Sequence, residues 1–311
     1  MGKETDIEWC DSTLNLQMGC DGCELWTAKV RNCYAGQLTE RYAGHNAGFP
    51  KAFNEPVIYP DRLAPALAWK DLTGTKRPDK PWLDGLPRMI FLNDMGDTFT
   101  ESLPLDWLAP FLPQMAGSPH QYMLLTKRGE RLRQFSELHP LPPNVWPGVS
   151  VTSQANIGRL ASLLKVCGGG PKWASFEPLL GQVEFLSTLI ETKYEWCERI
   201  PPPVLLRMAS RGEEPEFPWL ELAIFGGESG KEARPTDILH LRYGVQQCRD
   251  GGIAPFVKQM GSNFIGHEYD QHSGEIIGDF RWELEDPKGG EPREWPVDLR
   301  VREFPSTEGR P

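Results

Sequence analysis

The chain has 311 residues, a length that suits one α/β barrel or two smaller domains. Hydrophobic residues make up 39% of it and charged residues 24%, a globular composition that excludes an intrinsically disordered chain. The formal net charge of −10 argues against a protein that coats nucleic acid through a basic face.

The sequence contains no recognisable targeting or membrane-spanning signal. The first six residues, MGKETD, are not followed by the apolar core of a signal peptide. No run approaches the ~18 apolar residues of a membrane span. We therefore expect a cytoplasmic protein that does not engage a membrane.

Short apolar runs recur along the chain, and each is followed by polar and then helix-like sequence. Runs bounded by turn residues are typical of buried parallel strands. The predicted strands are 6–10, 89–92, 122–125, 145–151, 173–176, 222–225 and 255–257. The predicted helices are 34–42, 105–115, 129–138, 154–166 and 236–249. This alternation predicts an α/β fold, a full or partial (β/α) TIM-like barrel with an N-terminal cysteine-rich loop.

Three stretches do not follow the alternation. Residues 44–75 and 191–218 have the character of insertions. The tail 266–311 is polar and rich in Gly and Pro, and it predicts a small hairpin near 274–282 or a lid. We therefore expect a barrel over residues 1–265 and a C-terminal extension over 266–311.

Polar residues follow six of the predicted strands, where parallel α/β folds collect their active sites. The segments are Asn93–Asp97, Thr126–Arg128, Ser150–Ser153, Ser175–Pro178, Gly226–Ser229 and Lys258–Met260. Ser, Thr and Asp also cap helices, so each ending has a structural explanation when taken alone. Six such endings together favour the rim of an active site.

Cys20, Cys23 and Cys33 form a C-x2-C-x9-C pattern before the predicted helix 34–42. Three thiolates can ligate a structural zinc ion if His45 or Cys10 supplies a fourth ligand. They can equally ligate a [4Fe–4S] cluster, which then keeps one iron without a protein ligand. Spacing alone does not decide between zinc and the cluster. It also does not decide whether Cys10 belongs to the site. An open iron can bind a small molecule such as S-adenosylmethionine (SAM).

The sequence resembles the radical SAM superfamily and, more closely, the phage-associated three-cysteine-motif protein family of unknown function. The segments that carry the resemblance are DIEWCDSTLNLQMGCDGC, NCYAGQLTERY, IFLNDMGDTF, YMLLTKRGERL, NVWPGVSVTSQ, ASFEPLLG, IFGGESGKEARP and PFVKQMG. They lie between about residue 5 and residue 262. The cysteine spacing differs from the C-x3-C-x2-C that is usual in the superfamily.

The resemblance implies a [4Fe–4S] cluster on Cys20, Cys23 and Cys33 at the mouth of the barrel. The open iron would chelate SAM. One electron from a donor such as flavodoxin or ferredoxin would cleave SAM to methionine and a 5′-deoxyadenosyl radical. That radical would abstract hydrogen from a substrate, and the protein would position and shield the cofactors.

The resemblance also implies SAM contacts at the strand ends. Asp94 or Asp97, in the segment that begins at Asn93, would receive the amino group, which needs a carboxylate or carbonyl partner. Lys127 or Arg128 would meet the SAM carboxylate or a substrate phosphate. The other expected contacts are Ser150 and Ser153 for ribose or carboxylate, Glu177 for ribose or substrate, and Gly226, Gly227 and Glu228 for another side of SAM.

Several alternatives stay open. Instead of contacting SAM or substrate, Glu177 could form a salt bridge to Lys258. Gly226–Glu228 could form only a tight turn. Lys127, Arg128 and Arg234 suggest a nucleotide or nucleic-acid substrate, although the net charge of −10 opposes this. The alternative function is a zinc-stabilised barrel that binds a nucleic acid or a partner protein without catalysis.

Overall fold

The computed structural model describes residues 2–198, 217 and 219–305. The chain divides into two compact units. Of the described residues, unit 1 comprises 2–150 and 166–171, and unit 2 comprises 151–165, 172–198, 217 and 219–305.

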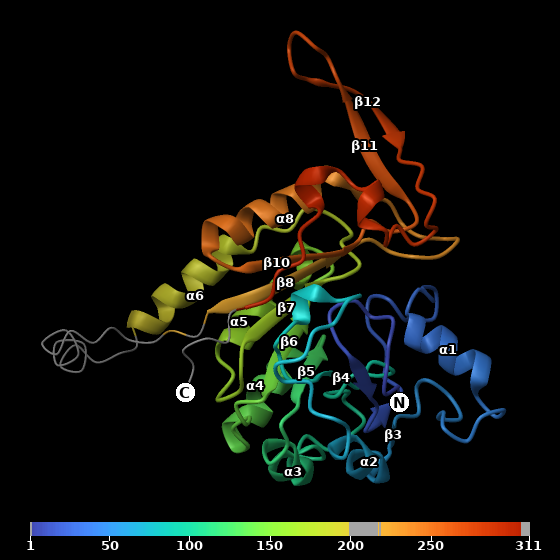
Figure 1. Ribbon diagram of the computed structural model, residues 1–311, viewed down its shortest axis with the longest axis vertical. Helices are drawn as coiled ribbons and strands as arrows, with labels where there is room; N and C mark the ends of the chain where they lie inside the picture. The colour runs from blue at the N-terminus through green and yellow to red at the C-terminus, as the bar shows by residue number, and fades with distance from the viewer. Residues whose placement is uncertain (1, 199–216, 218, 306–311) are drawn as a thin grey trace, which may run out of the picture. The chain divides into compact units, whose positions relative to one another are not determined.

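Seven of the described strands form one parallel sheet (Figure 1). They are β1 (Ser12–Leu14), β4 (Met89–Leu92), β5 (Gln121–Thr126), β6 (Val145–Ser150), β7 (Lys172–Phe176), β8 (Leu220–Gly226) and β10 (Ala254–Gln259). The strand order is β1-β4-β5-β6-β7-β8-β10, so the series runs open from β1 to β10. This order confirms the α/β class and is consistent with a partial (β/α) barrel.

Unit 1 contains β1, β4, β5 and β6, paired in parallel register. Every residue of β4 and β6 is buried, as expected for strands covered on both faces. The helix α4 (Gly129–Leu138) was predicted with these bounds. Its Leu132 and Phe135 are fully buried, and each stabilises the fold by about 1.5–3 kcal/mol through the apolar area removed from water.

The first predicted strand is wrong, because residues 6–10 form turns and β1 begins at Ser12. The ammonium group of Lys80 explains the difference. Its Nζ donates to the carbonyl oxygens of Thr5 and Ile7 at 2.7 Å and to that of Cys10 at 2.6 Å. Carbonyl groups that converge on one cation cannot also point sideways into a strand ladder.

Two predicted helices are shorter than expected. In place of 105–115, the chain forms the 3-10 turn η3 (Ala109–Phe111) and the short helix α3 (Leu112–Ala116). Pro110 and Pro113 have no N–H to donate, and this limits the helix. In place of 154–166, it forms η4 (Gln154–Asn156) and α5 (Gly158–Leu164). The helix α1 (Tyr34–Tyr42) has the predicted bounds.

The first predicted insertion contains little regular structure. Within 44–75 lie β3 (Val57–Ile58), which pairs with β2 (Gln17–Met18), then η1 (Pro60–Arg62) and α2 (Leu63–Leu67). The turn η2 (Pro81–Leu83) precedes β4. Of the second predicted insertion, residues 191–198 complete the helix α6 (Leu186–Glu198). Residues 199–216 and 218 lie outside the described part of the chain.

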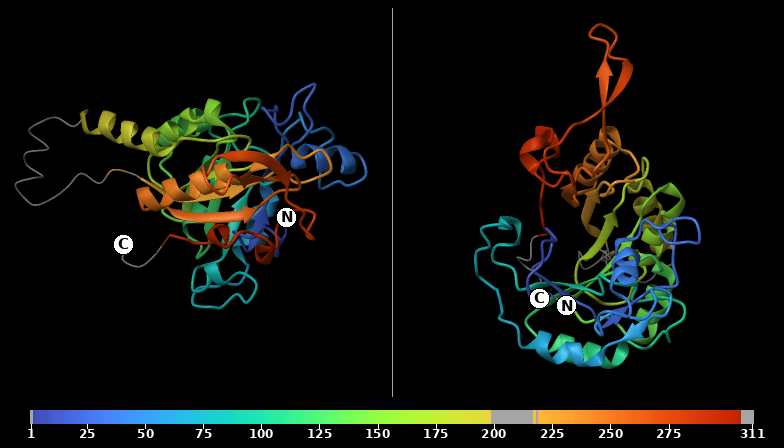
Figure 2. Two further views of the ribbon diagram at one scale, coloured as in Figure 1. Left: turned by 90° about the horizontal axis from the view of Figure 1, so that it is seen from above. Right: turned by 90° about the vertical axis from the view of Figure 1, so that its right-hand side faces the viewer.

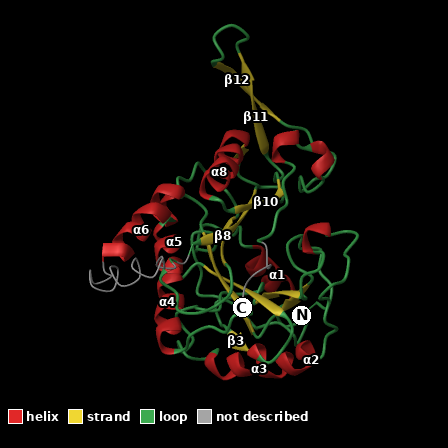
Figure 3. Ribbon diagram, turned by 60° about the vertical axis from the view of Figure 1, so that its left-hand side comes forward, coloured by secondary structure: helices red, strands yellow, loops and turns green. Residues whose placement is uncertain are grey.

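Unit 2 contains β7, β8 and β10 with α5, α6 and α8 (Ile238–Gly251). The helix α8 packs against β8, β10 and α6, and Figure 3 separates these helices from the strands by colour. Its start is fixed by Asp237, whose carboxylate accepts from the N–H of Leu239 at 2.7 Å. It ends at Gly252, whose φ of +64° suits glycine at a helix C-terminus.

The C-terminal segment forms a longer hairpin than the one predicted near 274–282. Strand β11 (Phe264–Tyr269) pairs antiparallel with β12 (Ile276–Arg281) and parallel with β9 (Thr236–Asp237). Figure 2 shows the hairpin extending away from α8. After η5 (Pro292–Glu294) and η6 (Val297–Leu299), the chain returns to β10, where Val257 donates to the carbonyl of Val301 at 2.8 Å. In the described residues, no helix combines the length and apolar character that crossing a membrane requires.

Candidate functional site

The three predicted cysteine ligands lie on one loop of unit 1, residues 19–33, here called the cysteine loop. Cys20 follows β2, and Cys33 is the residue that precedes the first turn of α1. Between Cys20 and Cys23, Gly22 has a φ of +100°, and a Cβ on it would stand 2.5 Å from the carbonyl oxygen of Trp26. Glycine is therefore required for this path of the loop.

An apolar cluster surrounds part of the cysteine loop. It contains Met18, Cys20, Trp26, Ala35, Phe53 and Met95, with Cys33 packed against it. The Trp26 ring lies against the first turn of α1, where a Cβ on Gly36 would stand 2.6 Å from it. Cys20 and Cys33, thirteen positions apart in the sequence, thus share one apolar environment, and bulk water has limited access to both.

Backbone N–H groups point at all three sulfur atoms. Gly22 donates to Sγ of Cys20 and Leu25 to Sγ of Cys23, each at 3.4 Å. Hydrogen bonds from the amides of Gly36 and Ala35, in the first turn of α1, lower the pKa of Cys33. A helix N-terminus and donated N–H groups favour a thiolate over a thiol.

Burial nevertheless raises the pKa of all three thiols, and it is the largest influence on each. Without a bound cation, burial therefore opposes ionisation of the three thiols. Each sulfur therefore receives hydrogen bonds that favour a thiolate, while its burial disfavours a negative charge that nothing balances. Such a donor set suits thiolates whose charge is balanced by iron or another metal ion.

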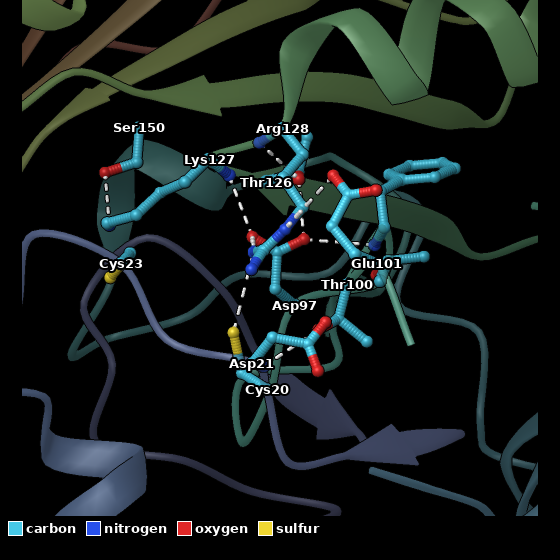
Figure 4. Close-up of polar contacts among 12 residues, drawn as sticks. Cys20, Asp21, Cys23, Asp97, Thr100, Glu101, Thr126, Lys127, Arg128 and Ser150 are labelled. Carbon is cyan, nitrogen blue, oxygen red and sulfur yellow. Dashed lines mark hydrogen bonds and ion pairs between the residues drawn. The ribbon is translucent and has the colours of Figure 1, made fainter. Parts of the chain in front are cut away.

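Two cations reach the cysteine loop from the C-terminal end of β5. Nη1 of Arg128 lies 3.5 Å from Sγ of Cys20 (Figure 4). Its Nη2 donates to the carbonyl of Gly22 at 2.9 Å. Lys127 donates to Oγ of Ser150 at 2.8 Å, and its charge lowers the pKa values of Cys23 and Cys33. Lys127, which holds Ser150 through this hydrogen bond, thus lies close enough to Cys23 and Cys33 for its charge to act on both.

Asp97 uses its carboxylate to organise this end of the sheet. Oδ1 accepts from the N–H of Phe99 at 3.0 Å and from the hydroxyl of Thr126 at 2.6 Å. Oδ2 accepts from the N–H of Lys127 at 3.0 Å and from Nη1 of Arg128 at 2.9 Å. Four donors from the chain itself occupy the carboxylate, so Asp97 positions its neighbours and has little capacity left for a ligand's ammonium group.

Sequence reasoning missed a second anchor of the cysteine loop. The N–H of Asp21 donates to Oγ1 of Thr100 at 2.9 Å, and its carboxylate accepts from the Thr100 hydroxyl at 2.6 Å and the Ser102 N–H at 2.9 Å. These contacts fasten the residue next to Cys20 to the segment after β4. Neither partner belongs to a motif with a recognisable spacing, so no sequence signal identified the pair.

Asn93 and Asp94 occupy different positions after β4. Asn93 is buried, with a φ of +61°, and both its amide atoms bind the chain: Oδ1 accepts from Gln17 at 2.9 Å and Nδ2 donates to Thr98 at 2.9 Å. Asp94 accepts from Nδ2 of Asn15 at 2.6 Å, and the hydroxyl of Tyr34 donates to its carbonyl oxygen. Tyr34 follows Cys33 directly, so Asp94 lies beside the cysteine loop. Burial raises the pKa of Asp94.

The remaining predicted residues belong to unit 2. Nζ of Lys258 lies 3.1 Å from Oε1 of Glu177, which confirms the salt bridge named as the structural alternative. A Cβ on Gly226 would stand 2.5 Å from the same Oε1. Glycine at position 226 is therefore needed to make room for the Glu177 carboxylate.

The Gly227–Glu228 turn is likewise accounted for by local contacts. A Cβ on Gly227 would collide with the Met260 carbonyl oxygen and stand 2.6 Å from Oγ1 of Thr236. Glu228 is buried and paired with Arg234, whose Nε and Nη2 donate at 2.9 and 2.6 Å. Ser153 precedes η4, and its hydroxyl lies 3.4 Å from Oδ1 of Asn156.

The other four cysteines lie outside the cysteine loop. Cys10 is fully buried before β1, and burial strongly raises its pKa. Cys167 is exposed and Cys248 buried, while the side chain of Cys197 lies outside the described part. Over the described ranges, no group of three or more His, Cys, Asp and Glu side chains stands in an arrangement that could hold a metal ion.

A family model described as a protein of unknown function (DUF5131) matches residues 4–283. No curated protein and no solved structure matches the chain.

Proposed function

The chain belongs to the DUF5131 family of proteins of unknown function, and from its cysteine loop we propose that it is a radical SAM-type enzyme. In this proposal Cys20, Cys23 and Cys33 hold a [4Fe–4S] cluster, and SAM binds at its open iron. A one-electron donor such as flavodoxin or ferredoxin serves the site, and a nucleotide or nucleic acid is the first substrate class to test.

The observation that carries the proposal is the set of donors around the three sulfurs. Hydrogen bonds to the sulfurs, nearby charge and solvent exposure set the properties of iron–sulfur clusters. Here each sulfur receives a backbone N–H, and Lys127 and Arg128 supply positive charge beside them. A cluster bound there supplies, after reduction by one electron, the cleavage of SAM to methionine and a 5′-deoxyadenosyl radical.

The residues beside the cysteine loop have separable tasks. Asp94 is the carboxylate suited to the SAM ammonium group, because the Asp97 carboxylate already accepts four hydrogen bonds from the chain. An ammonium at Asp94 would also offset the burial that raises its pKa. Lys127 and Ser150, which already share a hydrogen bond, are suited to the SAM carboxylate. The apolar cluster around Trp26 would limit the access of water.

The test is anaerobic purification and reconstitution with iron and sulfide, followed by reduction with dithionite in the presence of SAM. We expect about four irons and four sulfides per chain, as a [4Fe–4S] cluster requires, and release of 5′-deoxyadenosine. Replacing Cys20, Cys23 and Cys33 together by Ala should remove the iron and the SAM cleavage. Cys167→Ala should change neither, because Cys167 is an exposed thiol outside the cysteine loop.

Metal analysis of the same preparations separates the proposal from its alternative. One zinc per chain, no sulfide and intact SAM would refute radical chemistry. The protein would then be a zinc-stabilised barrel, and a partner protein or nucleic acid would be sought as its ligand. If iron and sulfide are present but SAM is not cleaved, the assignment of the cluster stands and the proposed reaction is refuted.

A further inference from the structure

Arg128 joins three groups that are distant in sequence. Its guanidinium contacts Sγ of Cys20 at 3.5 Å, the carbonyl of Gly22 at 2.9 Å and the carboxylate of Asp97 at 2.9 Å. The side chain is 14% exposed and that of Asp97 is 9% exposed, so the pair is largely removed from water. Arginine suits this place because its planar fork can bind several acceptors in fixed directions at once.

The position of Arg128 distinguishes Cys20 from the other two cysteines. Sγ of Cys23 receives an N–H from Leu25, and Cys33 receives hydrogen bonds from the first turn of α1. Sγ of Cys20 has a backbone donor in Gly22 and, in addition, a guanidinium. A charged donor at a ligand sulfur stabilises the form of a metal centre that carries more negative charge. Reduction of an oxidised [4Fe–4S] cluster by one external electron creates that form.

Asp97 opposes this effect while it holds Arg128 in place. Its carboxylate is ion-paired with the guanidinium, so its negative charge counteracts the positive charge that Cys20 experiences. Glu101 also lies near, with Oε1 at 3.9 Å from Nε of Arg128, but its side chain is 63% exposed. Solvent screens an exposed charge at this distance, so its influence on Cys20 is small.

We propose that Arg128 is a positioning residue that raises the reduction potential of a cluster on Cys20, and that Asp97 limits this increase. The inference rests on the proposed function, because it needs the cluster. Its distinctive consequence is that two substitutions shift the reduction potential in opposite directions. Removing the Arg128 charge lowers the potential, and removing the Asp97 charge raises it. A residue that only shaped the loop would have no reason to produce shifts of opposite sign.

The experiment is a redox titration of the reconstituted full chain without SAM, followed by electron paramagnetic resonance of the reduced cluster. Arg128→Met should lower the ratio of reduced to oxidised cluster about tenfold at the wild-type midpoint, a shift of ~59 mV for one electron. Asp97→Asn should shift the midpoint in the positive direction. Glu101→Gln is the matched control and should leave the midpoint unchanged, because it removes a neighbouring but exposed carboxylate.

Arg128→Lys is the second variant, since loss of the fork in Arg128→Met could prevent cluster assembly. It keeps a positive charge but cannot reach Cys20, Gly22 and Asp97 together, so its midpoint should lie between those of wild type and Arg128→Met. If neither Arg128 variant binds iron, the test of the proposal is whether Asp97→Asn shifts the midpoint potential in the positive direction. An unchanged midpoint in Asp97→Asn, or shifts of one sign in both charge-removing variants, overturns the inference. Absence of iron and sulfide from the wild-type protein instead refutes the proposed function itself.

Discussion

Gly227 lies where the chain leaves β8 and passes the carbonyl group of Met260. The sequence motif Gly226-Gly227-Glu228-Ser229 suggested contact with SAM, yet the packing of unit 2 already requires glycine at the first two positions. Glu228, the charged residue of the motif, is bound by Arg234. Residue type alone could not separate a ligand-binding glycine from one required by close packing, because both need the absence of a Cβ.

We predict that Gly227→Ala destabilises the protein by about 1–3 kcal/mol, the usual cost of forcing extra atoms into a packed site. The added Cβ would meet the Met260 carbonyl and the Thr236 hydroxyl. Urea unfolding followed by circular dichroism measures the change. Gly181→Ala is the control, because no heavy atom lies within 4 Å of a Cβ there. Unchanged stability in Gly227→Ala would show that packing does not require this glycine.

At the scale of elements, the hairpin β11–β12 is tied to the start of α8 through one imidazole. Nε2 of His267 lies 2.8 Å from Oδ1 of Asp237, and Nδ1 lies 2.7 Å from Oδ1 of Asp279. Asp237 is also the residue that caps α8. Only the protonated imidazolium can donate to both carboxylates at once. The hydrogen bond to Asp237, followed by that to Asp279, accordingly raises the pKa of His267.

We predict that His267 stabilises the docking of the hairpin more at pH 6 than at pH 8. Because the pKa is raised on folding, the contribution is complete below the ordinary histidine pKa of about 6.5 and is lost as pH rises through the folded value. The difference in thermal stability between wild type and His267→Gln should therefore shrink as pH rises. His272→Gln, in the exposed hairpin tip, is the control. A difference that does not depend on pH would contradict the prediction.

Helices and strands with a strong local sequence pattern were predictable. Segments whose backbone is bound by residues far away in the sequence were not. The bounds predicted for α1 and α4 and for the apolar run of β4 are all correct to the residue. The strand expected at 6–10 failed because Lys80, seventy positions after Cys10, binds the carbonyl groups of that segment. Periodicity describes which side chains are apolar and cannot describe where a backbone carbonyl finds its donor.

For the whole molecule, 33 Lys and Arg side chains against 43 Asp and Glu make general attraction to polyanions unfavourable. Two of the cations that suggested nucleic-acid contact, Arg128 and Arg234, are paired with Asp97 and Glu228. Any nucleic-acid substrate would therefore be recognised by a local site and not by the general charge of the protein.

We predict that non-specific duplex DNA binds more weakly than about 10⁻⁴ M at physiological salt, the weak end of the usual range. Fluorescence anisotropy of a labelled duplex, repeated at two salt concentrations, measures this. Micromolar binding that weakens steeply with added salt would contradict the prediction and reveal a basic surface that the net charge conceals. Salt-independent weak binding would agree with the charge argument.

The sequence by itself determined the α/β class, most strand positions and the three cysteines of one loop, because hydrophobic period and residue spacing are local properties of a chain. Only the tertiary structure decided which polar strand-end residues meet those cysteines. Arg128 lies 108 positions from Cys20 and still reaches its sulfur, whereas Glu177 is paired with Lys258 and Glu228 with Arg234. Such pairings depend on which strand ends the fold brings together, and the spacing of residues along the chain does not determine that.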